Sequence, residues 1–87
     1  MYFEAIFQPS NEGQYNSDAK RIIGKRIAVQ DGWILEDGPH KGQQGYYIPK
    51  STMGVIPACD LKEIRNIPYA KWKEIFKSVE LGGFSEA

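Results

Sequence analysis

The chain has 87 residues, of which 41% are hydrophobic and 13% are aromatic. A chain of this size can bury one compact core but has little room for a deep catalytic cleft as well, so we expect a single domain over residues 1–87. The eleven basic and eleven acidic residues cancel. The chain therefore lacks the overall positive charge that drives most binding to nucleic acid.

Cysteine content and hydropathy bear on where the protein works. The single cysteine, Cys59, excludes an internal disulfide. Residues 1–5 lack the basic start and apolar run of a secretory signal peptide. No apolar run approaches the ~18 residues that a membrane-spanning helix needs. These features predict a cytoplasmic protein that does not enter a membrane.

The first two-thirds of the chain are β-prone segments separated by turn formers. Phe3, Ala5 and Phe7 alternate with their neighbours in the way that a half-buried strand requires. Residues 10–21 are polar and predict a long loop, and Asp31-Gly32 predicts a tight hairpin turn. The predicted strands are residues 2–8, 25–30, 33–35, 46–48, 53–57 and 62–67.

This spacing of short strands and turns predicts a mainly β fold, a small barrel of five or six strands. Residues 36–45 hold three glycines and a proline, which indicates a loop between two of the strands. The residues expected to form most of the core are Phe3, Ala5, Phe7, Ile27, Val29, Ile34, Val55 and Ile64.

The last twenty residues have a different pattern. Trp72, Ile75, Phe76 and Val79 recur at helical spacing and form one apolar stripe. Pro68 suits the start of a helix, and two glycines at 82–83 suit its end. The pattern predicts a helix over residues 68–81 that packs its stripe on the barrel.

Residues 24–64 resemble the second half of an SH3 domain. Gly24-Lys25-Arg26-Ile27-Ala28-Val29 is similar to the Gly-Asp-x-Ile-x-Val run of that family, and Asp31-Gly32-Trp33 to its turn and Gly-Trp pair. Gly54-Val55-Ile56-Pro57 matches the Gly-x-x-Pro segment, which in the family precedes a short helical turn and a last strand. Residues 2–7 fit the first strand.

The resemblance implies an SH3-like barrel with a shallow aromatic groove, which in that family receives extended, proline-rich peptides. Carried over by position, Trp33 and Pro57 would lie in that groove. Tyr47 and, from the long loop, Tyr15 would border it. The resemblance thus implies that these four residues bind a protein or peptide partner.

Two departures from the family pattern concern the ligand. Asp60 stands where the family usually has a groove tyrosine, and the long loop carries Lys20 and Arg21 in place of an acidic run. With Lys25 and Arg26, these cations form a basic segment. The segment supports an alternative, a nucleic-acid-binding accessory protein in which this segment contacts phosphates.

Residues for catalysis are sparse. His40 is the only histidine and lies in a Gly/Pro-rich loop, where we expect it to be exposed. Cys59 has no base beside it in the sequence and is expected to be a small buried residue. Glu36-Asp37 is typical of a turn. We therefore expect no enzymatic activity, no metal site and no cofactor.

The predicted function is a non-catalytic protein–protein interaction module, an accessory or inhibitory protein of a bacterial or mobile-element system.

Overall fold

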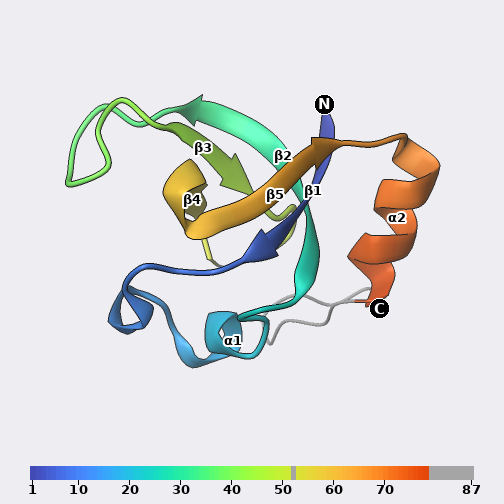
Figure 1. Ribbon diagram of the computed structural model, residues 1–87, viewed down its shortest axis with the longest axis horizontal. Helices are drawn as coiled ribbons and strands as arrows, with labels where there is room; N and C mark the ends of the chain where they lie inside the picture. Colours follow the sequence, from blue (N-terminus) through green and yellow to red (C-terminus); the bar gives the residue numbers. More distant parts are fainter. Residues whose placement is uncertain (52, 79–87) are drawn as a thin grey trace.

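The computed structural model of the chain describes residues 1–51 and 53–78, and within these ranges an antiparallel sheet is followed by a helix (Figure 1). The predicted fold class, mainly β with a C-terminal helix, is confirmed. The strands are β1 (Tyr2–Phe7), β2 (Arg26–Ile34), β3 (Gln44–Tyr47), β4 (Val55–Pro57) and β5 (Leu61–Asn66). The helices are η1 (Glu12–Gln14), α1 (Ser17–Lys20), η2 (Ala58–Asp60) and α2 (Tyr69–Ser78).

The five strands lie in the order β4-β3-β2-β1-β5, and every neighbouring pair is antiparallel. β2 is the longest strand and has two partners. Its first half pairs with β1, where Ile27 lies opposite Ala5, and its second half pairs with β3, where Gln30 lies opposite Tyr47. β2 therefore links the two halves of the sheet.

The predicted hairpin turn at Asp31-Gly32 is wrong. These residues lie inside β2, which continues to Ile34, so the strand expected at 33–35 is not separate. Gly32 lacks the positive φ that a tight Asp-Gly turn requires, and the pairing of β2 with β3 is irregular just after Asp31. A glycine inside a strand commonly marks such a bulge. The chain reverses in the next loop, where Gly38 and Gly42 have φ values of 81° and 91°.

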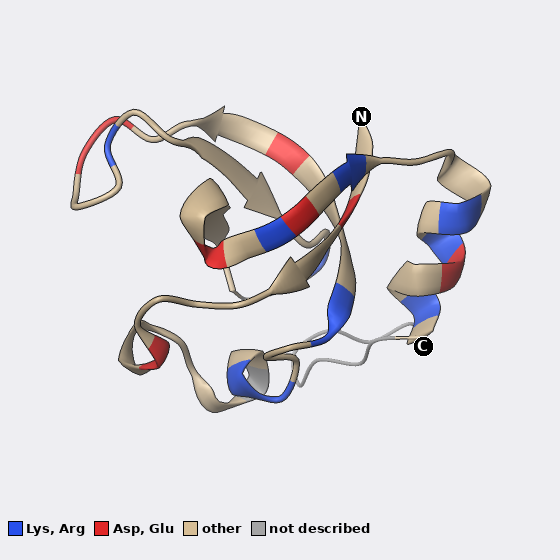
Figure 2. Ribbon diagram, viewed as in Figure 1, with Lys and Arg blue, Asp and Glu red and all other residues tan. Residues whose placement is uncertain are grey.

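The edge strand β5 is strongly charged (Figure 2). Lys62, Glu63 and Arg65 are all exposed along it. Because charged side chains on an edge strand oppose pairing with another chain, this edge is protected against sheet extension.

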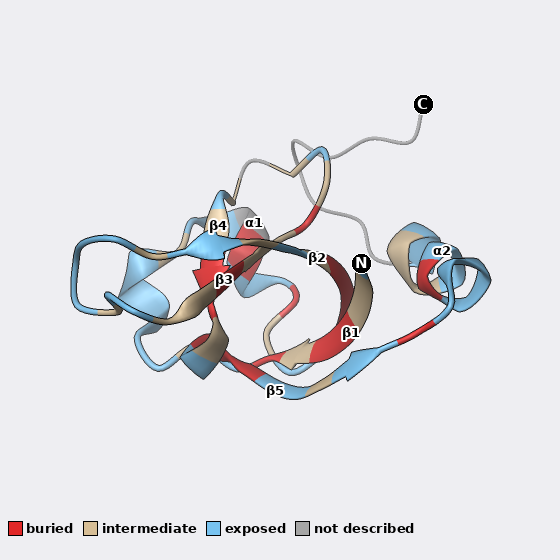
Figure 3. Ribbon diagram, turned by 90° about the horizontal axis from the view of Figure 1, so that it is seen from above, coloured by how far each residue is buried: buried red, intermediate tan, exposed pale blue. Residues whose placement is uncertain are grey.

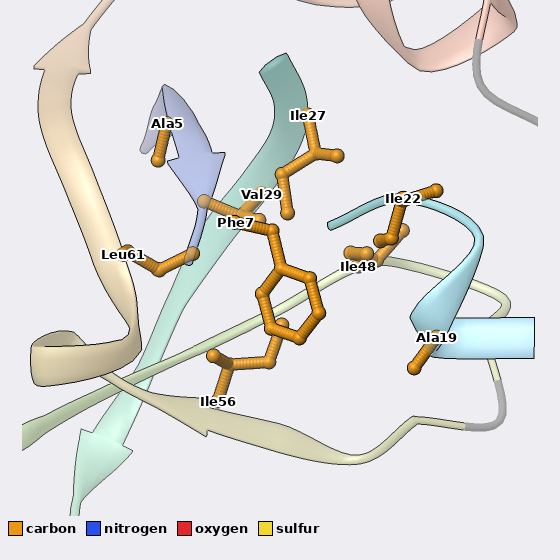
Figure 4. Packing of buried hydrophobic residues seen from close by; sticks show 9 residues of the cluster. All are labelled: Ala5, Phe7, Ala19, Ile22, Ile27, Val29, Ile48, Ile56 and Leu61. Carbon is orange, nitrogen blue, oxygen red and sulfur yellow. The ribbon is translucent and has the colours of Figure 1, made fainter. Parts of the chain in front are cut away.

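The strands curve around the main hydrophobic core, and a second cluster of Ala28, Ile67 and Trp72 lies beneath α2 (Figure 3). Nine buried side chains from the sheet, from α1 and from two connecting segments point toward one another in Figure 4. They are Ala5, Phe7, Ala19, Ile22, Ile27, Val29, Ile48, Ile56 and Leu61.

The predicted core is confirmed at Ala5, Phe7, Ile27 and Val29, which are buried. Phe3, Val55 and Ile64 are only partly buried. The prediction is wrong at Ile34, since its side chain is 52% exposed. It lies past the irregularity in β2, on the part of the strand that extends beyond the pairing with β1 and hence beyond the core.

The segment predicted as a long polar loop, residues 10–21, contains the short helices η1 and α1. Ala19 of α1 and the following Ile22 are buried in the core. The Tyr15 ring packs edge-on against Phe7, with 4.9 Å between the ring centroids. The segment thus covers one side of the core instead of running free over the surface.

Helix α2 packs on the outer side of β1 and β2 (Figures 1 and 3). The carbonyl of Pro68 accepts the N–H of Trp72 at 3.0 Å and begins the helix. Trp72 is 5% exposed, and its Nε1–H donates to the Val29 carbonyl at 2.9 Å. Its ring lies 5.1 Å from that of Tyr2. The predicted packing of the stripe on the sheet is therefore confirmed at Trp72, while Phe76 is partly buried.

The remainder of the predicted helix, with Val79 and the expected end at 82–83, lies outside the described residues. Within the described residues, no helix is long and apolar enough to cross a membrane.

Candidate functional site

The most exposed aromatic side chain of the sheet borders a surface hollow. Trp33, near the end of β2, is 61% exposed. The hollow beside it, called here the Trp33 hollow, has a volume of about 510 Å³. It lies between the end of β2, β3 and the chain that leads into β4. Its lining residues are Asp31, Gly32, Trp33, Tyr47, Ile48, Pro49, Lys50, Ser51, Gly54 and Val55.

Strand pairing holds the walls of the Trp33 hollow in place. Tyr47 lies opposite Gln30 in the β2–β3 ladder, and its hydroxyl donates to Gln30 Oε1 at 3.2 Å. Gly45 of β3 is buried where the strands approach closely, and a side chain at this position would collide with Val55. Val55, which lines the hollow, can therefore pack this closely on β3 because residue 45 has no side chain.

One carboxylate lies in the wall of the Trp33 hollow. The Asp31 side chain accepts a hydrogen bond from the amino group of Met1 at 2.9 Å. This hydrogen bond, together with one from the Asp31 backbone, lowers the pKa of the carboxyl group. Burial acts in the opposite direction but has a smaller effect. Asp31 is therefore ionised at neutral pH, with a positive partner beside it.

A second hollow, called here the Tyr15 hollow, lies on the other side of β4. Its volume is about 270 Å³. Its lining includes Tyr15, His40 and Pro57, together with Gln14, Leu35, Asp37, Pro39, Met53 and Val55. Val55 lines both hollows. The four residues predicted to bind a partner are thus divided between two hollows that meet at this valine.

Asp60 holds the long loop against η2. Its side chain is fully buried and accepts hydrogen bonds from the Ser10 N–H and hydroxyl, both at 3.0 Å, and from the Tyr15 hydroxyl at 2.5 Å. The Cys59 thiol lies 3.6 Å from the same carboxylate. Asp60 therefore fixes both Ser10 and the Tyr15 ring of the loop.

These contacts shift the pKa values of the Asp60 carboxyl group and the Tyr15 hydroxyl. Burial favours the neutral form of Asp60, but the hydrogen bonds from Tyr15, Ser10 and Cys59 together outweigh it, so the pKa of the carboxyl group is lowered. Burial and the hydrogen bond to Asp60 raise the pKa of the Tyr15 hydroxyl. At neutral pH the pair is therefore a carboxylate and a protonated phenol.

Cys59 is exposed, which contradicts the expectation that it would be buried. Its sulfur lies 3.4 Å from His40 Nδ1, and its backbone N–H donates to Gln43 Oε1 at 3.0 Å. The histidine is partly buried instead of exposed. Residues 40 and 59 are far apart in sequence, which is why this thiol–imidazole contact could not be inferred from neighbouring residues.

The basic segment lies at the end of α1 and the start of β2. Lys20, Arg21 and Lys25 are exposed. Arg26 is partly buried, and its guanidinium pairs with the buried Glu4 carboxylate at 3.1 Å. Arg26, one of the predicted phosphate ligands, is therefore held within the sheet.

Comparison of the chain with protein-family models, with curated proteins and with solved structures gave no match.

Proposed function

We propose that this chain is a non-catalytic protein-interaction module that binds its partner at the Trp33 hollow. The observation that carries the proposal is an exposed tryptophan beside an apolar hollow of about 510 Å³. Large rings at a surface supply contact area with few rotors to immobilise, and tryptophan and tyrosine are enriched among residues that dominate binding energy. The Trp33 hollow offers both, in Trp33 and Tyr47.

The proposal includes an SH3-like barrel as the scaffold. The curvature of the sheet around its core, the short helix η2 after Pro57 and the strand β5 that follows agree with the resemblance seen in the sequence (Figure 3). The role of an accessory or inhibitory protein in a bacterial or mobile-element system belongs to the same proposal and rests on the sequence alone.

Preformed walls favour binding at this site. Trp33 and Tyr47 are carried by paired strands, and Tyr47 is tied to Gln30 by its hydroxyl. A surface that is already ordered loses little conformational entropy when a partner binds.

The test is an affinity capture from cells of the source organism, with wild-type, Trp33→Ala and Ile34→Ala proteins as baits. Ile34 is a matched control, because it is also exposed and lies next to Trp33 but does not line the hollow. Mass spectrometry identifies the partner, and calorimetry then measures its affinity for each protein. We expect Trp33→Ala to weaken binding by about 2 kcal/mol or more, with Ile34→Ala close to wild type.

A partner that binds both variants equally would refute the proposal. If capture recovers only nucleic acid, with an affinity that falls steeply with salt and depends on Lys20, Arg21 and Lys25, the alternative function replaces it. A circular-dichroism melt of each variant shows that the fold is intact.

A further inference from the structure

A third hollow lies between α2 and the sheet, and aromatic rings form much of it. It has a volume of about 330 Å³. Trp72 is the most buried of its rings, and the rings of Tyr2 and Phe76 lie 5.1 and 4.8 Å from it. Tyr69, which is 51% exposed, completes the set. The rings form a firm apolar base, because they already pack against one another.

Lysines surround this base, and we call it the lysine hollow. Lys50, Lys73 and Lys77 line it, and all three are exposed. Among the residues that the structure describes, no carboxylate lines this hollow and none of these three ammonium groups forms an ion pair. Basic residues are also prominent along α2 in Figure 2. A neutral chain thus carries one hollow with a concentrated positive charge.

The lysine hollow adjoins the Trp33 hollow. Pro49 and Lys50 line both of them. Tyr47 of the Trp33 hollow also donates its hydroxyl hydrogen bond to Gln30, which lines the lysine hollow. One end of the combined surface is therefore apolar with exposed rings, and the other end is cationic.

We propose that the two hollows form one groove for an acidic peptide segment of the partner protein. An apolar side chain of the segment occupies the Trp33 hollow, and carboxylates beside it contact Lys50, Lys73 and Lys77. An extended chain advances ~3.3 Å per residue, so about six residues would span ~20 Å. That length fits within the longest dimension of the molecule, 33 Å. This inference rests on the proposed function and adds the chemistry of the ligand.

The charge distribution favours an acidic peptide over a single-stranded nucleic acid. A nucleic acid carries a phosphate at every residue, and proteins that bind it line the whole path with cations. Here Lys73 and Lys77 line only one end, Lys50 lies where the two ends adjoin, and the carboxylate of Asp31 lies in the other end. A peptide can match both ends, because its charged and apolar side chains are placed independently.

The experiment selects a random peptide library displayed on phage against the immobilised protein and sequences the bound peptides. We expect the enriched peptides to combine an apolar or aromatic residue with a run of Asp and Glu. The strongest peptide is then synthesised with a fluorescent label and titrated with wild-type protein and with two charge variants.

The two charge variants distinguish an effect of the lysines in the groove on peptide affinity from an effect of the protein's overall charge. Lys73→Glu/Lys77→Glu reverses two charges in the lysine hollow, and Lys71→Glu/Lys62→Glu reverses two exposed lysines outside it, one of them on α2. Because close charge pairs at a surface each change affinity severalfold, we expect the first variant to raise the Kd about tenfold or more and the second to change it less than twofold. Melting curves verify that both variants fold.

Each other outcome is decisive. The enriched peptides could lack acidic residues, bind both charge variants as tightly as wild type and fail to bind Trp33→Ala. That result would overturn the acidic-peptide inference and leave the proposed function standing. If no peptide is enriched, the acidic-peptide inference falls, and the capture experiment with Trp33→Ala and Ile34→Ala decides the proposed function. If a labelled oligothymidylate binds through Lys73 and Lys77 more tightly than any selected peptide, the groove is a nucleic-acid site instead.

Discussion

The hydrogen bond from Tyr15 to Asp60 should be one of the strongest polar interactions in the protein, and Tyr15→Phe tests it. The change removes one hydroxyl and leaves the ring that packs against Phe7, so no cavity is created. A hydrogen bond to a charged group contributes about 1.5–3 kcal/mol, and this one is short, at 2.5 Å, to a fully buried carboxylate. We expect a loss of about 2 kcal/mol in the free energy of unfolding.

Tyr47→Phe is the matched control. Its hydroxyl donates to the neutral Gln30 amide oxygen at 3.2 Å, so its removal should cost about 0.5–1 kcal/mol. Urea unfolding, followed by tryptophan fluorescence at pH 7, measures both variants. A double-mutant cycle with Asp60→Asn isolates the pair, and we expect a coupling energy of about 1 kcal/mol or more.

The pH dependence gives an independent check. The folded pKa of Asp60 is lowered below its unfolded value of about 3.9, so its contribution to stability is present above that value and is lost as the pH falls through the folded pKa. The stability difference between wild type and Asp60→Asn should therefore shrink as the pH is lowered from about 5. Equal costs for Tyr15→Phe and Tyr47→Phe, together with additive effects in the cycle, would refute this account of the Asp60 contacts.

Urea unfolding of three further variants tests the packing at Trp72 and Gly45 and the backbone conformation at Lys50. Trp72→Ala should lower the free energy of unfolding by about 3–5 kcal/mol, whereas Tyr69→Ala should cost less, because the Tyr69 ring packs on Tyr2 but is 51% exposed. Equal losses would mean that α2 is not docked as described. Gly45→Ala should cost about 1–3 kcal/mol because the added Cβ collides with β4, while Gly32→Ala meets only ordinary contacts and serves as its control. Lys50 has a φ of 65°, so Lys50→Gly should raise stability by about 1 kcal/mol, and a destabilised variant would contradict the assigned strain.

Hydrophobic patterns in the sequence correctly predicted the strand and the helix whose spacing of apolar residues matches their secondary structure. The alternation in residues 2–8 and the stripe that includes Trp72 correspond to β1 and α2, because one face of each is buried. The Asp31-Gly32 turn failed for the opposite reason. Its local preference is outweighed by pairing with β3, about fifteen residues further along the chain, and that pairing leaves no sign near residue 31.

The same limit applies to the candidate site. The SH3 resemblance implied one groove with Trp33, Tyr47, Pro57 and Tyr15, whereas Trp33 and Tyr47 line one hollow and Pro57 and Tyr15 line another. The contact of Cys59 with His40 spans 19 positions, and that of Asp60 with Tyr15 spans 45. Such contacts follow from the way the sheet curves, which periodicity does not encode.

Strand β2 has a consequence for how the proposed binding site can change. Its first half supplies Ile27 and Val29 to the core, while its second half ends in Trp33 and Ile34, whose side chains are mostly in solvent. Replacing either of the last two residues removes little buried area, so selection can vary them almost independently of folding. A single continuous strand thus joins a segment constrained by packing to one that is free to diversify, so the proposed binding site can change without redesign of the interior.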